Sequence, residues 1–555
     1  MKQSELFTKT KKEYAKDETS INAKLLIKAG YINKLMAGVY TFLPMGLRVL
    51  NKVENIIREE MDKIGGQEVL MPALQPKENW LKTGRWEGLD ILFKTGEKAR
   101  EYAMGPTHEE VVTPLAGEYL MSYKDMPMYI YQIQSKFRNE PRAKAGLLRG
   151  REFRMKDFYS FHTDDKDFEE YYEKVAKAYE TIWKRLGIGD ETFRVKASGG
   201  SFSKYSDEYQ TICETGEDLL FKGNKEIYNR EIAPSKAPEF KQDDTEGKME
   251  EVKGEGIIGV EKLAKFLKIA VEATTKTILF ENEKGEVIAG AVRGDYEINE
   301  LKLTEVSQSE ELKLASEEVV KKITGAEVGY AGILNLPKNV KLFMDDSMQG
   351  RVNFETGANK TDYHTINVNF SRDMEEPKEF YDIKVAKEGD LDPETGKAYE
   401  TMKAIEVGNI FPLKSKFADD FGLKYTDEKG KLHSVVMGCY GMGSSRVMGA
   451  LVEVFHDDKG MIWPENVAPF KYHLINLSAD AKVKKQAEDL YNRLMEKGEE
   501  VLYDDRGEAS PGEKLKDADL IGLPYRLVVS DKTQGKVEVK KRDSKELDIK
   551  EMDDI

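Results

Sequence analysis

The sequence predicts an α+β core, a second α+β domain inserted into that core, and a small α/β domain at the C-terminal end. Amphipathic helices flank strand-like stretches in the first part, a polar segment then interrupts them, and the end of the chain alternates strand and helix. A chain of 555 residues has room for about three or four domains. We therefore expect a core in two parts, an insertion and a tail domain, at residues 1–227 with 404–470, 228–403 and 471–555 respectively.

The core is expected to be an antiparallel sheet flanked by two long helices. In residues 48–63 and 165–186, apolar residues recur three or four positions apart with charges between them, which indicates amphipathic helices. Two consecutive glycines end the first helix, and a short strand follows. The stretches 128–140 and 150–161 are strand-like.

The inserted block begins with a polar segment. Residues 233–256 contain proline, glycine and charge but almost no apolar residues, which is typical of a linker or a mobile loop. Beyond it we expect a helix at 259–267, a pair of hairpin strands within 276–293 and a helix at 316–325. A second polar stretch, 387–400, closes the block.

The tail alternates strand and helix. Strands are expected at 472–478, 499–505 and 525–530, with helices at 483–498 and 511–522. This order predicts a small α/β domain of the doubly wound kind.

Composition excludes several classes of protein. Hydrophobic residues make up 40% of the chain and charged residues 34%, which is globular rather than collagenous or disordered. No apolar run approaches the ~20 residues that span a bilayer, and residues 1–18 lack the apolar core of a secretory signal. Cys213 and Cys439 are too few for a disulfide framework or a Cys-rich zinc site, and they fit a reducing cytosol. We expect a cytoplasmic protein with no membrane contact.

The net charge is unevenly distributed. A formal charge of −15 argues against a general nucleic-acid coat protein, because such proteins neutralise phosphates with a basic surface. However, residues 228–403 hold 25 Lys and Arg against 36 Asp and Glu, whereas residues 136–156 hold eight Lys and Arg against two Glu. Contact with an RNA would therefore be local and guided by shape.

The basic segment 136–156 is the first candidate site. A charge run is most often a solvated face. Arg138 and Glu140, however, lie two positions apart on an expected strand, so they project from one face. The following loop returns through Arg149 and Phe153. Because guanidinium groups can meet phosphates and an aromatic ring can stack on a base, this segment suits a nucleoside triphosphate.

A glycine-rich turn is expected at 438–446, before a helix at 447–455. Such a turn lets the backbone approach a ligand closely, and Arg446 at the helix start supplies a phosphate-binding charge. The segment is not a P-loop, since no Gly-Lys-Ser/Thr follows, and it lacks the dinucleotide-binding spacing GxGxxG. A tight turn without any ligand is about as well supported as a binding role.

Residues 105–110, GPTHEE, form the third candidate. His108 and Glu109 suggest a zinc protease, but Val112 stands where the motif HExxH needs its second His. A helix N-terminus capped by Thr107 also accounts for the pattern, and it leaves Thr107 and Glu109 able to face a ligand. Six scattered histidines do not form a metal cluster, so we expect no metal held by the protein alone.

In their order along the chain, these segments resemble the three signature motifs of class II aminoacyl-tRNA synthetases. The first motif is a long helix and a strand that ends in proline, and it matches residues 48–72. The second is Phe-Arg-x-Glu, a loop and Arg-x-x-x-Phe, which match FRNE at 137–140 and RGREF at 149–153. The third is a glycine turn with an arginine before a helix, which matches GMGSSR at 441–446. The class I signatures HIGH and KMSKS are absent. GRWEG, GPTHEEVVTPL, GREFRMKDFYSFHTD and EVGNIF look like bacterial-type prolyl-tRNA synthetases almost end to end.

The resemblance implies a class II synthetase core, an editing insertion and an anticodon-binding tail, with L-proline, ATP, Mg²⁺ and tRNA(Pro) as ligands. It implies that Glu109 pairs with the secondary amine of proline and that Thr107 hydrogen-bonds to it. Arg138 would hold the proline carboxylate and the α-phosphate at once. Asn409, where many relatives carry His, and Cys439 would complete the proline pocket.

For ATP, the resemblance implies that Phe153 and Arg446 sandwich the adenine and that Glu140 lies near its amino edge or near a bound water. Arg149 would take the outer phosphates, which Mg²⁺ bridges. Glu406 is a further residue implied for ATP. The residues implied to act in catalysis are Arg138, Glu140 and Arg446.

The insertion is similar to free-standing deacylases of mischarged tRNA, and Lys276, Asp345 and His364 match the editing residues of that family. On spacing alone, Lys276 fits an ordinary exposed strand lysine and His364 a surface-loop histidine. Their co-occurrence favours hydrolysis of Ala-tRNA in a second site, although Ile333 stands where the family's loop has proline.

The leading hypothesis is therefore an enzyme of the prolyl type that uses ATP to join proline to tRNA, homodimeric through the helix at 48–63, with no DNA or membrane partner. The alternatives are a sister enzyme for threonine, serine, glycine or histidine and a tRNA-binding paralogue that no longer catalyses. A threonyl enzyme should show zinc ligands in its core, and a paralogue should have lost Arg138, Glu140 or Arg446.

Overall fold

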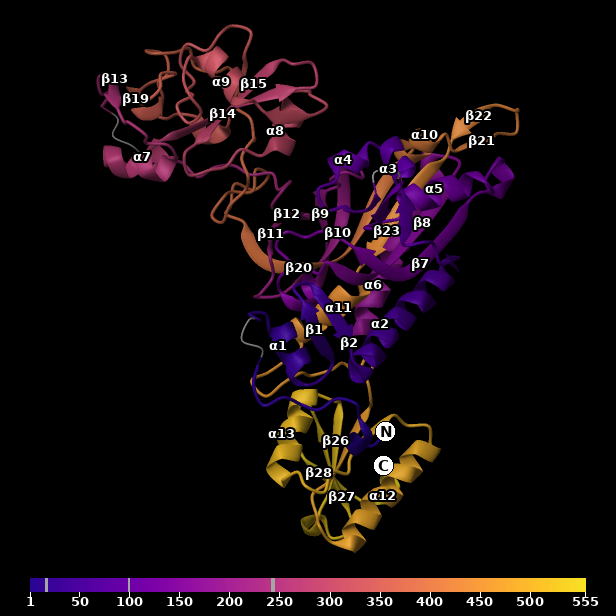
Figure 1. Cartoon of the computed structure of the whole chain (residues 1–555). Coiled ribbons are helices and arrows are strands. Elements are labelled where there is room, and N and C mark those ends of the chain that lie inside the picture. The colour runs from indigo at the N-terminus through magenta and orange to yellow at the C-terminus, as the bar shows by residue number, and fades with distance from the viewer. Residues whose placement is uncertain (15–17, 98–99, 241–244) are drawn as a thin grey trace. The chain divides into compact units, whose positions relative to one another are not determined.

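The computed structural model describes residues 1–14, 18–97, 100–240 and 245–555, and the chain divides into two compact units (Figure 1). Unit 1 contains Met1–Arg194, Gly199–Glu217 and Lys403–Ile555, and unit 2 contains Val195–Ser198 and Asp218–Met402. Residues 218–227, which the sequence assigns to the core, thus belong to unit 2. Among the helices of the described ranges, none is long and apolar enough to cross a bilayer.

Six strands of a larger, nine-stranded sheet form the core of unit 1 and pair in the order β10-β20-β23-β8-β7-β3. All neighbours in this order are antiparallel except β3, which is parallel to β7. This confirms the predicted antiparallel core. The strands are β3 (Gln67–Glu68), β7 (Met128–Phe137), β8 (Glu152–His162), β10 (Tyr205–Ile212), β20 (Glu400–Lys414) and β23 (Val436–Met442).

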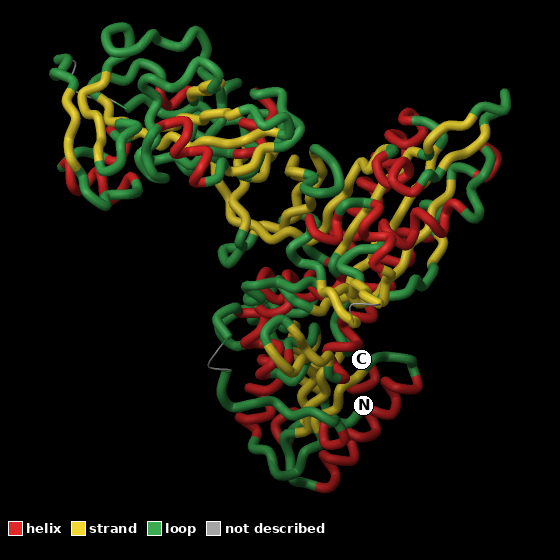
Figure 2. Tube along the Cα trace, turned by 45° about the horizontal axis from the view of Figure 1, so that its top comes forward, coloured by secondary structure: helices red, strands yellow, loops and turns green. Residues whose placement is uncertain are grey.

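Helices α2 (Pro44–Lys63) and α6 (Asp165–Leu186) lie side by side and cover this sheet (Figures 1 and 2). Both long helices predicted from the sequence are confirmed, although the first begins earlier, at Pro44, whose fixed φ suits the first helical turn. Their apolar stripes are buried, together with that of α11 (Ser444–Val454), in the main hydrophobic core.

Two local predictions for the core are wrong. Arg138 and Glu140 lie beyond the end of β7 rather than on a strand. The expected glycine turn at 438–446 is mostly strand β23, and only Gly443 lies between that strand and α11. Gly438 is needed for packing, because a Cβ there would lie 2.4 Å from the hydroxyl of Tyr440.

The tail forms a five-stranded sheet in the order β25-β24-β26-β27-β28. β24 is parallel to β25 and β26, as the doubly wound prediction requires. The sequence missed the antiparallel β27 and β28 that extend the sheet. The elements are β24 (Tyr472–Asn476), α12 (Ala481–Glu496), β25 (Val501–Asp504), α13 (Pro511–Ile521), β26 (Tyr525–Val529), β27 (Val537–Lys541) and β28 (Asp548–Lys550).

Unit 2 contains two further sheets, in the orders β16-β14-β15-β17 and β13-β19-β18. The predicted first helix, hairpin and last helix are confirmed as α7, β14 with β15, and α9. The elements are β13 (Glu250–Lys253), α7 (Val260–Leu267), β14 (Thr275–Asn282), β15 (Val287–Arg293), α8 (Glu300–Val306), β16 (Leu312–Leu314), α9 (Glu317–Thr324), β17 (Lys341–Met344), β18 (Phe354–Gly357) and β19 (Tyr363–Val368).

Part of the predicted linker at 233–256 forms a strand. Its residues 241–244 lie outside the described ranges, but Glu250–Lys253 forms β13, which pairs with β19. The linker prediction is therefore wrong for β13. The strand is held by ladder hydrogen bonds rather than by buried apolar side chains, so composition carried no signal of it.

Candidate active site

Strands β8, β20 and β23 and the segment after β7 border a cavity of about 140 Å³ in unit 1. Antiparallel pairing places β20 and β23 beside β8, so residues far apart in the sequence share this cavity. The lining includes these predicted site residues: Thr107, Arg138, Phe153, Glu406, Asn409, Cys439 and Arg446. Glu109, Glu140 and Arg149 lie outside the lining.

The carboxylate of Glu109 is fully buried next to the lining residue Thr107. Thr107 Oγ1 donates a hydrogen bond of 2.5 Å to Oε2, and Tyr159 Oη and Cys439 Sγ donate to Oε1 at 3.1 and 3.2 Å. Arg85 Nη1 lies 3.5 Å from Oε2 and supplies the opposite charge that a buried carboxylate requires. Arg85 was not among the residues predicted from the sequence, although the motif GRWEG contains it.

Thr107 does not cap the helix that follows it. Helix α5 (Glu109–Gly117) has His108 as its N-cap, with no side-chain capping bond. The capping prediction is therefore wrong, because the Thr107 hydroxyl donates to Glu109 instead. This arrangement leaves Thr107 facing the cavity while its hydroxyl stays oriented by Glu109.

Cys439 lies within β23 and is not a reactive thiol. Burial and the neighbouring Glu109 carboxylate raise the pKa of Cys439 well above its usual range. A protonated thiol donates to Glu109 and does not act as a nucleophile.

Two guanidinium groups line the cavity. The guanidinium carbon of Arg138 lies 5.2 Å from the centroid of the Phe153 ring, and its buried Nε has no hydrogen-bond partner within the described part of the chain. Arg446 Nη1 lies 2.6 Å from Glu406 Oε2 and 3.1 Å from the Glu406 carbonyl. Burial, followed by the positive charge of Arg446, lowers the pKa of Arg138. Two neighbouring cations in a partly desolvated site favour an anionic ligand.

Glu140 and Arg149, from the segments FRNE and RGREF, are separate from the cavity lining. Arg149 Nε donates to Glu140 Oε2 at 2.9 Å, and Arg149 Nη1 lies 3.6 Å from Glu217 Oε2. The Arg149 side chain is 43% exposed, so it remains accessible to a ligand that extends out of the cavity.

A buried polar network reaches the cavity through Asp157. Lys136 Nζ lies 2.7 Å from Asp157 Oδ1 and 2.6 Å from His108 Nδ1, and His108 Nε2 lies 3.1 Å from the Pro72 carbonyl. Burial, with the adjacent Lys136, lowers the pKa of His108 to about 4, so its ring is neutral at physiological pH. Lys136 and Asp157 were not predicted as site residues, although Lys136 begins the basic segment 136–156; each is a charged residue within a strand.

Asn409 contributes an unused acceptor to the lining. Its Nδ2 donates weakly to Glu208 Oε1 and Glu406 Oε1, at 3.3 and 3.4 Å. Its Oδ1 is buried and has no hydrogen-bond partner among the residues that the structure describes. A buried acceptor without a partner is costly, which points to a ligand donor at this position.

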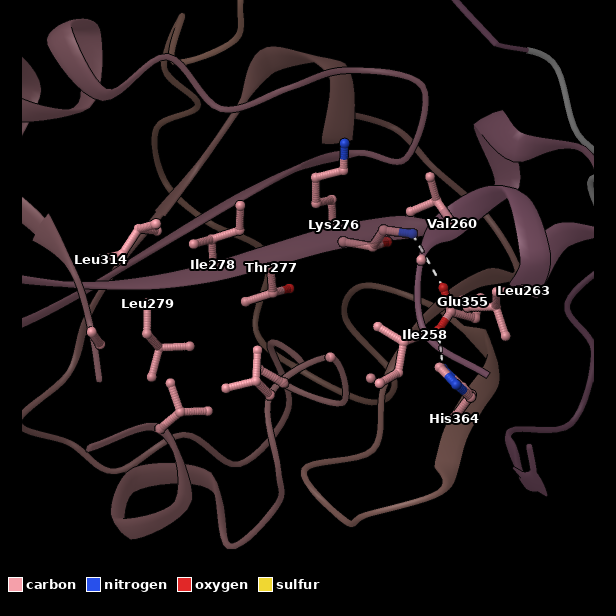
Figure 3. Close-up of a pocket in the computed structure, with 18 residues that line it drawn as sticks. Ile258, Val260, Leu263, Lys276, Thr277, Ile278, Leu279, Leu314, Glu355 and His364 are labelled. Carbon is pink, nitrogen blue, oxygen red and sulfur yellow. Dashed lines mark hydrogen bonds and ion pairs between the residues drawn. The ribbon is translucent and has the colours of Figure 1, made fainter. Parts of the chain in front are cut away.

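Unit 2 contains a larger cavity, of about 380 Å³ (Figure 3). Aliphatic side chains supply most of its lining, with Glu355 and His364 among the few polar groups. His364 lies on β19 and is only 4% exposed, so the surface-loop alternative is wrong. The Lys276 side chain is 18% exposed, so it is not an ordinary exposed lysine either.

The three predicted editing residues do not form one cluster. Lys276 is part of the cavity lining, but its Nζ points away from His364 and contacts the Tyr296 carbonyl and the Glu297 carboxylate (Figure 3). Asp345 lies outside the lining, and its buried carboxylate accepts backbone N–H groups, from Ser347 at 2.9 Å and from Ile383 at 2.8 Å. These contacts give Asp345 a role in holding the backbone.

Two models of known families match the chain. Residues 93–455 match the model of the tRNA synthetase class II core domain of the G, H, P, S and T enzymes. Residues 467–555 match an anticodon binding domain.

Full-length relatives and a solved structure agree with these domains. The chain is 39% identical to a proline–tRNA ligase of Bacillus cereus (strain B4264), over 100% of this chain and 98% of the relative. It is 42% identical to a proline–tRNA ligase of Aquifex aeolicus (strain VF5), over 98% and 95% of the two chains. The fold resembles that of Giardia lamblia prolyl-tRNA synthetase in complex with prolyl-adenylate, with a TM-score of 0.57, 14% identity, and coverage of 96% of this chain and 75% of that one.

Proposed function

This chain belongs to the proline–tRNA ligase family of class II synthetases, and from this membership we propose that its unit 1 cavity activates L-proline with ATP and passes the prolyl group to tRNA(Pro). The observation that carries the proposal is the convergence of Arg138, Arg446 and Phe153 on one cavity of the class II core. The relatives favour proline over the threonine, serine, glycine and histidine alternatives, and the retained Arg138, Glu140 and Arg446 argue against a paralogue without activity.

In the first step, a carboxylate oxygen of proline attacks the α-phosphorus of ATP, and the bond from that phosphorus to the bridging oxygen of pyrophosphate breaks. We propose that Arg138 neutralises both the attacking carboxylate and the α-phosphate. Holding the two reactants in line and offsetting their charge supplies most of what such a transfer requires of a protein.

The proline amine is proposed to bind beside Thr107. Glu109 is proposed to act through Thr107. Its carboxylate accepts a hydrogen bond from the Thr107 hydroxyl, orients that hydroxyl, and adds negative potential near the amine. The free Oδ1 of Asn409 is a second acceptor for the amine. Cys439 contributes a neutral wall to this pocket.

ATP is proposed to place its adenine between Phe153 and Arg446, with Glu140 near its amino edge and Arg149 on its outer phosphates. Arg149 is accessible for this role. Mg²⁺ supplies charge neutralisation on the phosphates when bound, and the Glu406 carboxylate is the cavity group suited to hold it, because Mg²⁺ prefers oxygen ligands.

In the second step, a hydroxyl of the terminal ribose of tRNA attacks the prolyl carbonyl carbon, the bond from that carbon to the phosphate oxygen of AMP breaks, and the hydroxyl proton leaves with AMP. The anticodon-binding domain at 467–555 supports tRNA as the acceptor. We place this reaction in the cytoplasm and expect a homodimer through α2. Leu47, at 46% exposed on that helix, and Leu70, at 78%, offer apolar surface for such contact.

We further propose that unit 2 hydrolyses alanyl-tRNA(Pro). Both His364 and Lys276 line its cavity of about 380 Å³, which supports a second site for a mischarged product. Asp345 would act there through the backbone that it holds.

Proline-dependent exchange of pyrophosphate into ATP tests the main proposal. Arg138→Ala should lower the exchange rate by about 10²–10³-fold, the cost of losing one group aimed at transition-state charge. Arg142→Ala removes an exposed arginine from the same basic segment and should exchange like the unaltered enzyme. Near-normal exchange by Arg138→Ala would show that the site lies elsewhere.

A further inference from the structure

A buried carboxyl–imidazole pair borders the unit 2 cavity. Glu355 on β18 and His364 on β19 come from paired antiparallel strands, and Glu355 Oε1 lies 3.0 Å from His364 Nδ1 (Figure 3). Their side chains are only 1% and 4% exposed. The second oxygen of Glu355 accepts from the Thr275 backbone N–H at 3.2 Å, so the carboxyl group is held at both ends.

The other ring nitrogen of His364 determines how many protons the pair carries. His364 Nε2 lies 3.2 Å from the Ile257 carbonyl, which can only accept, so Nε2 must carry a hydrogen. His364 Nδ1 and Glu355 Oε1 are in hydrogen-bond contact, so a second hydrogen must lie between these two atoms. The pair therefore holds two protons and is neutral overall, either as imidazolium with carboxylate or as imidazole with carboxylic acid. Burial raises the pKa of Glu355, which favours retention of this proton.

With this proton count, the pair itself does not offer a ready general base. A base would need a free lone pair on Nε2, as arises when Nδ1–H donates to an ionised carboxylate and Nε2 is bare. Here Nε2–H is a donor, and Ile257 directly precedes Ile258 of the cavity lining. A ligand oxygen that replaced the Ile257 carbonyl would receive this hydrogen bond.

We propose that Glu355 is a positioning residue that keeps His364 as a hydrogen-bond donor to the carbonyl oxygen of an aminoacyl ester in the unit 2 cavity. This inference rests on the proposed hydrolysis of alanyl-tRNA. Water adds to the ester carbonyl carbon, whose bond to the ribose oxygen breaks. One water proton ends on the ribose oxygen, and the other is released with the amino-acid carboxylate. The Nε2–H group stabilises the charge that develops on the carbonyl oxygen.

The surroundings of the pair contain few other titratable groups. Lys276 directs its ammonium toward Glu297, and the Tyr330 hydroxyl donates to Asp362 at 2.8 Å. The titratable and charged groups near the pair are Lys276, Tyr330, Arg351 and Asp362. Within the described part of the chain, none of these four side chains contacts the Nε2 nitrogen, whose partner is the Ile257 carbonyl.

Glutamine at position 355 separates a donor role from a base role. In Glu355→Gln, the amide N–H donates to Nδ1 and keeps the hydrogen on Nε2, so we expect alanine release from preformed alanyl-tRNA(Pro) within about twofold of the unaltered enzyme. Glu355→Leu removes the partner and should slow release about tenfold, while His364→Phe removes the donor and should slow it by about 10²-fold. A base role instead requires the carboxylate, so strong loss of release in Glu355→Gln would overturn the proposal.

The pH profile supplies a readout that a purely structural role would not move. After subtraction of spontaneous ester hydrolysis, release by the unaltered enzyme should fall as rising pH removes the shared proton. The Glu355→Gln profile should lack this fall at rising pH, because the amide shares no such proton with the ring. A rate that rises with pH in the unaltered enzyme would contradict the donor role. Normal proline-dependent exchange shows that each Glu355 variant is folded in unit 1.

Nitrogen-15 spectra of the histidine rings test the donor state without any hydrolysis. The chain has six histidines, and His364→Gln identifies the resonances of His364. We expect a protonated Nε2 at neutral pH in both the unaltered enzyme and Glu355→Gln. A bare Nε2 would overturn the inference on its own. Failure of the unaltered enzyme to release alanine would instead refute the proposed editing function, while the spectra still decide the state of the pair.

Discussion

The cavities of units 1 and 2 differ in both size and charge. The unit 1 cavity has a volume of about 140 Å³, and Arg138, Arg446 and Glu406 contribute charged groups to it. The unit 2 cavity has about 380 Å³ and is mainly aliphatic, with a carboxyl–imidazole pair that is neutral overall. The first suits a reaction between anions, and the second suits a reaction of a neutral ester.

The difference also lies in how buried polar groups are supported. Around the unit 1 cavity, charged groups pair with one another, as Lys136 does with Asp157 and Arg85 with Glu109. In unit 2, Glu355 is held by a backbone N–H and by His364. Loss of one ion partner should therefore be costly in unit 1, whereas exchange of Glu355 for a neutral isostere should be mild in unit 2.

The largest effect is expected for Lys136→Met. This change leaves the Asp157 carboxylate buried without its cation and should lower the free energy of unfolding by about 3–5 kcal/mol. Thermal unfolding measures the loss. Lys144→Met, whose lysine is 66% exposed, is the matched control and should unfold like the unaltered chain.

Replacing both partners sharpens this test. Lys136→Met combined with Asp157→Leu removes the uncompensated charge and should recover part of the lost stability, although not proline-dependent exchange. An unchanged unfolding midpoint in the single variant would show that the pair is not the buried support described above.

Arg446→Ala should have the next largest effect. It removes one cavity cation and frees Glu406, so proline-dependent exchange should fall by about 10²–10³-fold. Release of alanine from preformed alanyl-tRNA(Pro) should remain, since unit 2 carries that proposed reaction. An equal loss of both activities would break the division of chemistry between the cavities.

Acid should destabilise unit 1 through His108. Its pKa is lowered to about 4 in the folded chain by burial and Lys136, whereas an unfolded histidine has a pKa of about 6.5. The unfolded chain therefore binds the proton first as pH falls, and stability present above about pH 6.5 is lost progressively down to about pH 4. The loss from this group amounts to about 3 kcal/mol at most.

Histidine ring spectra measure the titration of His108 directly. Its signal should remain that of a neutral ring at pH 5.5. A His108 ring that titrates near pH 6.5 would contradict its described burial.

The smallest effect is expected for Cys439→Ser. A serine hydroxyl can still donate to Glu109, so exchange should stay within about threefold of the unaltered enzyme. Thiol-modifying reagents should leave exchange unchanged because the thiol is buried and protonated. A large loss of activity would point to chemistry at this sulfur.

Periodic segments and contiguous motifs could be predicted from the sequence. The apolar stripes at 48–63 and 165–186 gave α2 and α6, because a helix repeats its buried face within a few residues. Motif residues such as Arg138 and Arg446 were also identified and share a cavity. The bounds of β7 and β23 were less well predicted, since strand ends depend on partners elsewhere in the chain.

The supporting contacts could not be predicted in the same way. Arg85 meets Glu109, and Glu355 meets His364, only after the chain has folded. Nothing in their local spacing indicates the partner. Asp345 shows the opposite error, since its place in a motif suggested a role in the cavity although its carboxylate holds backbone amides.

Amino-acid dependence of pyrophosphate exchange tests the central claim most directly. The unaltered enzyme should exchange pyrophosphate into ATP when supplied with proline and show only background rates with threonine, serine, glycine or histidine. Exchange with one of those four and none with proline would contradict the assignment of the unit 1 cavity to proline activation.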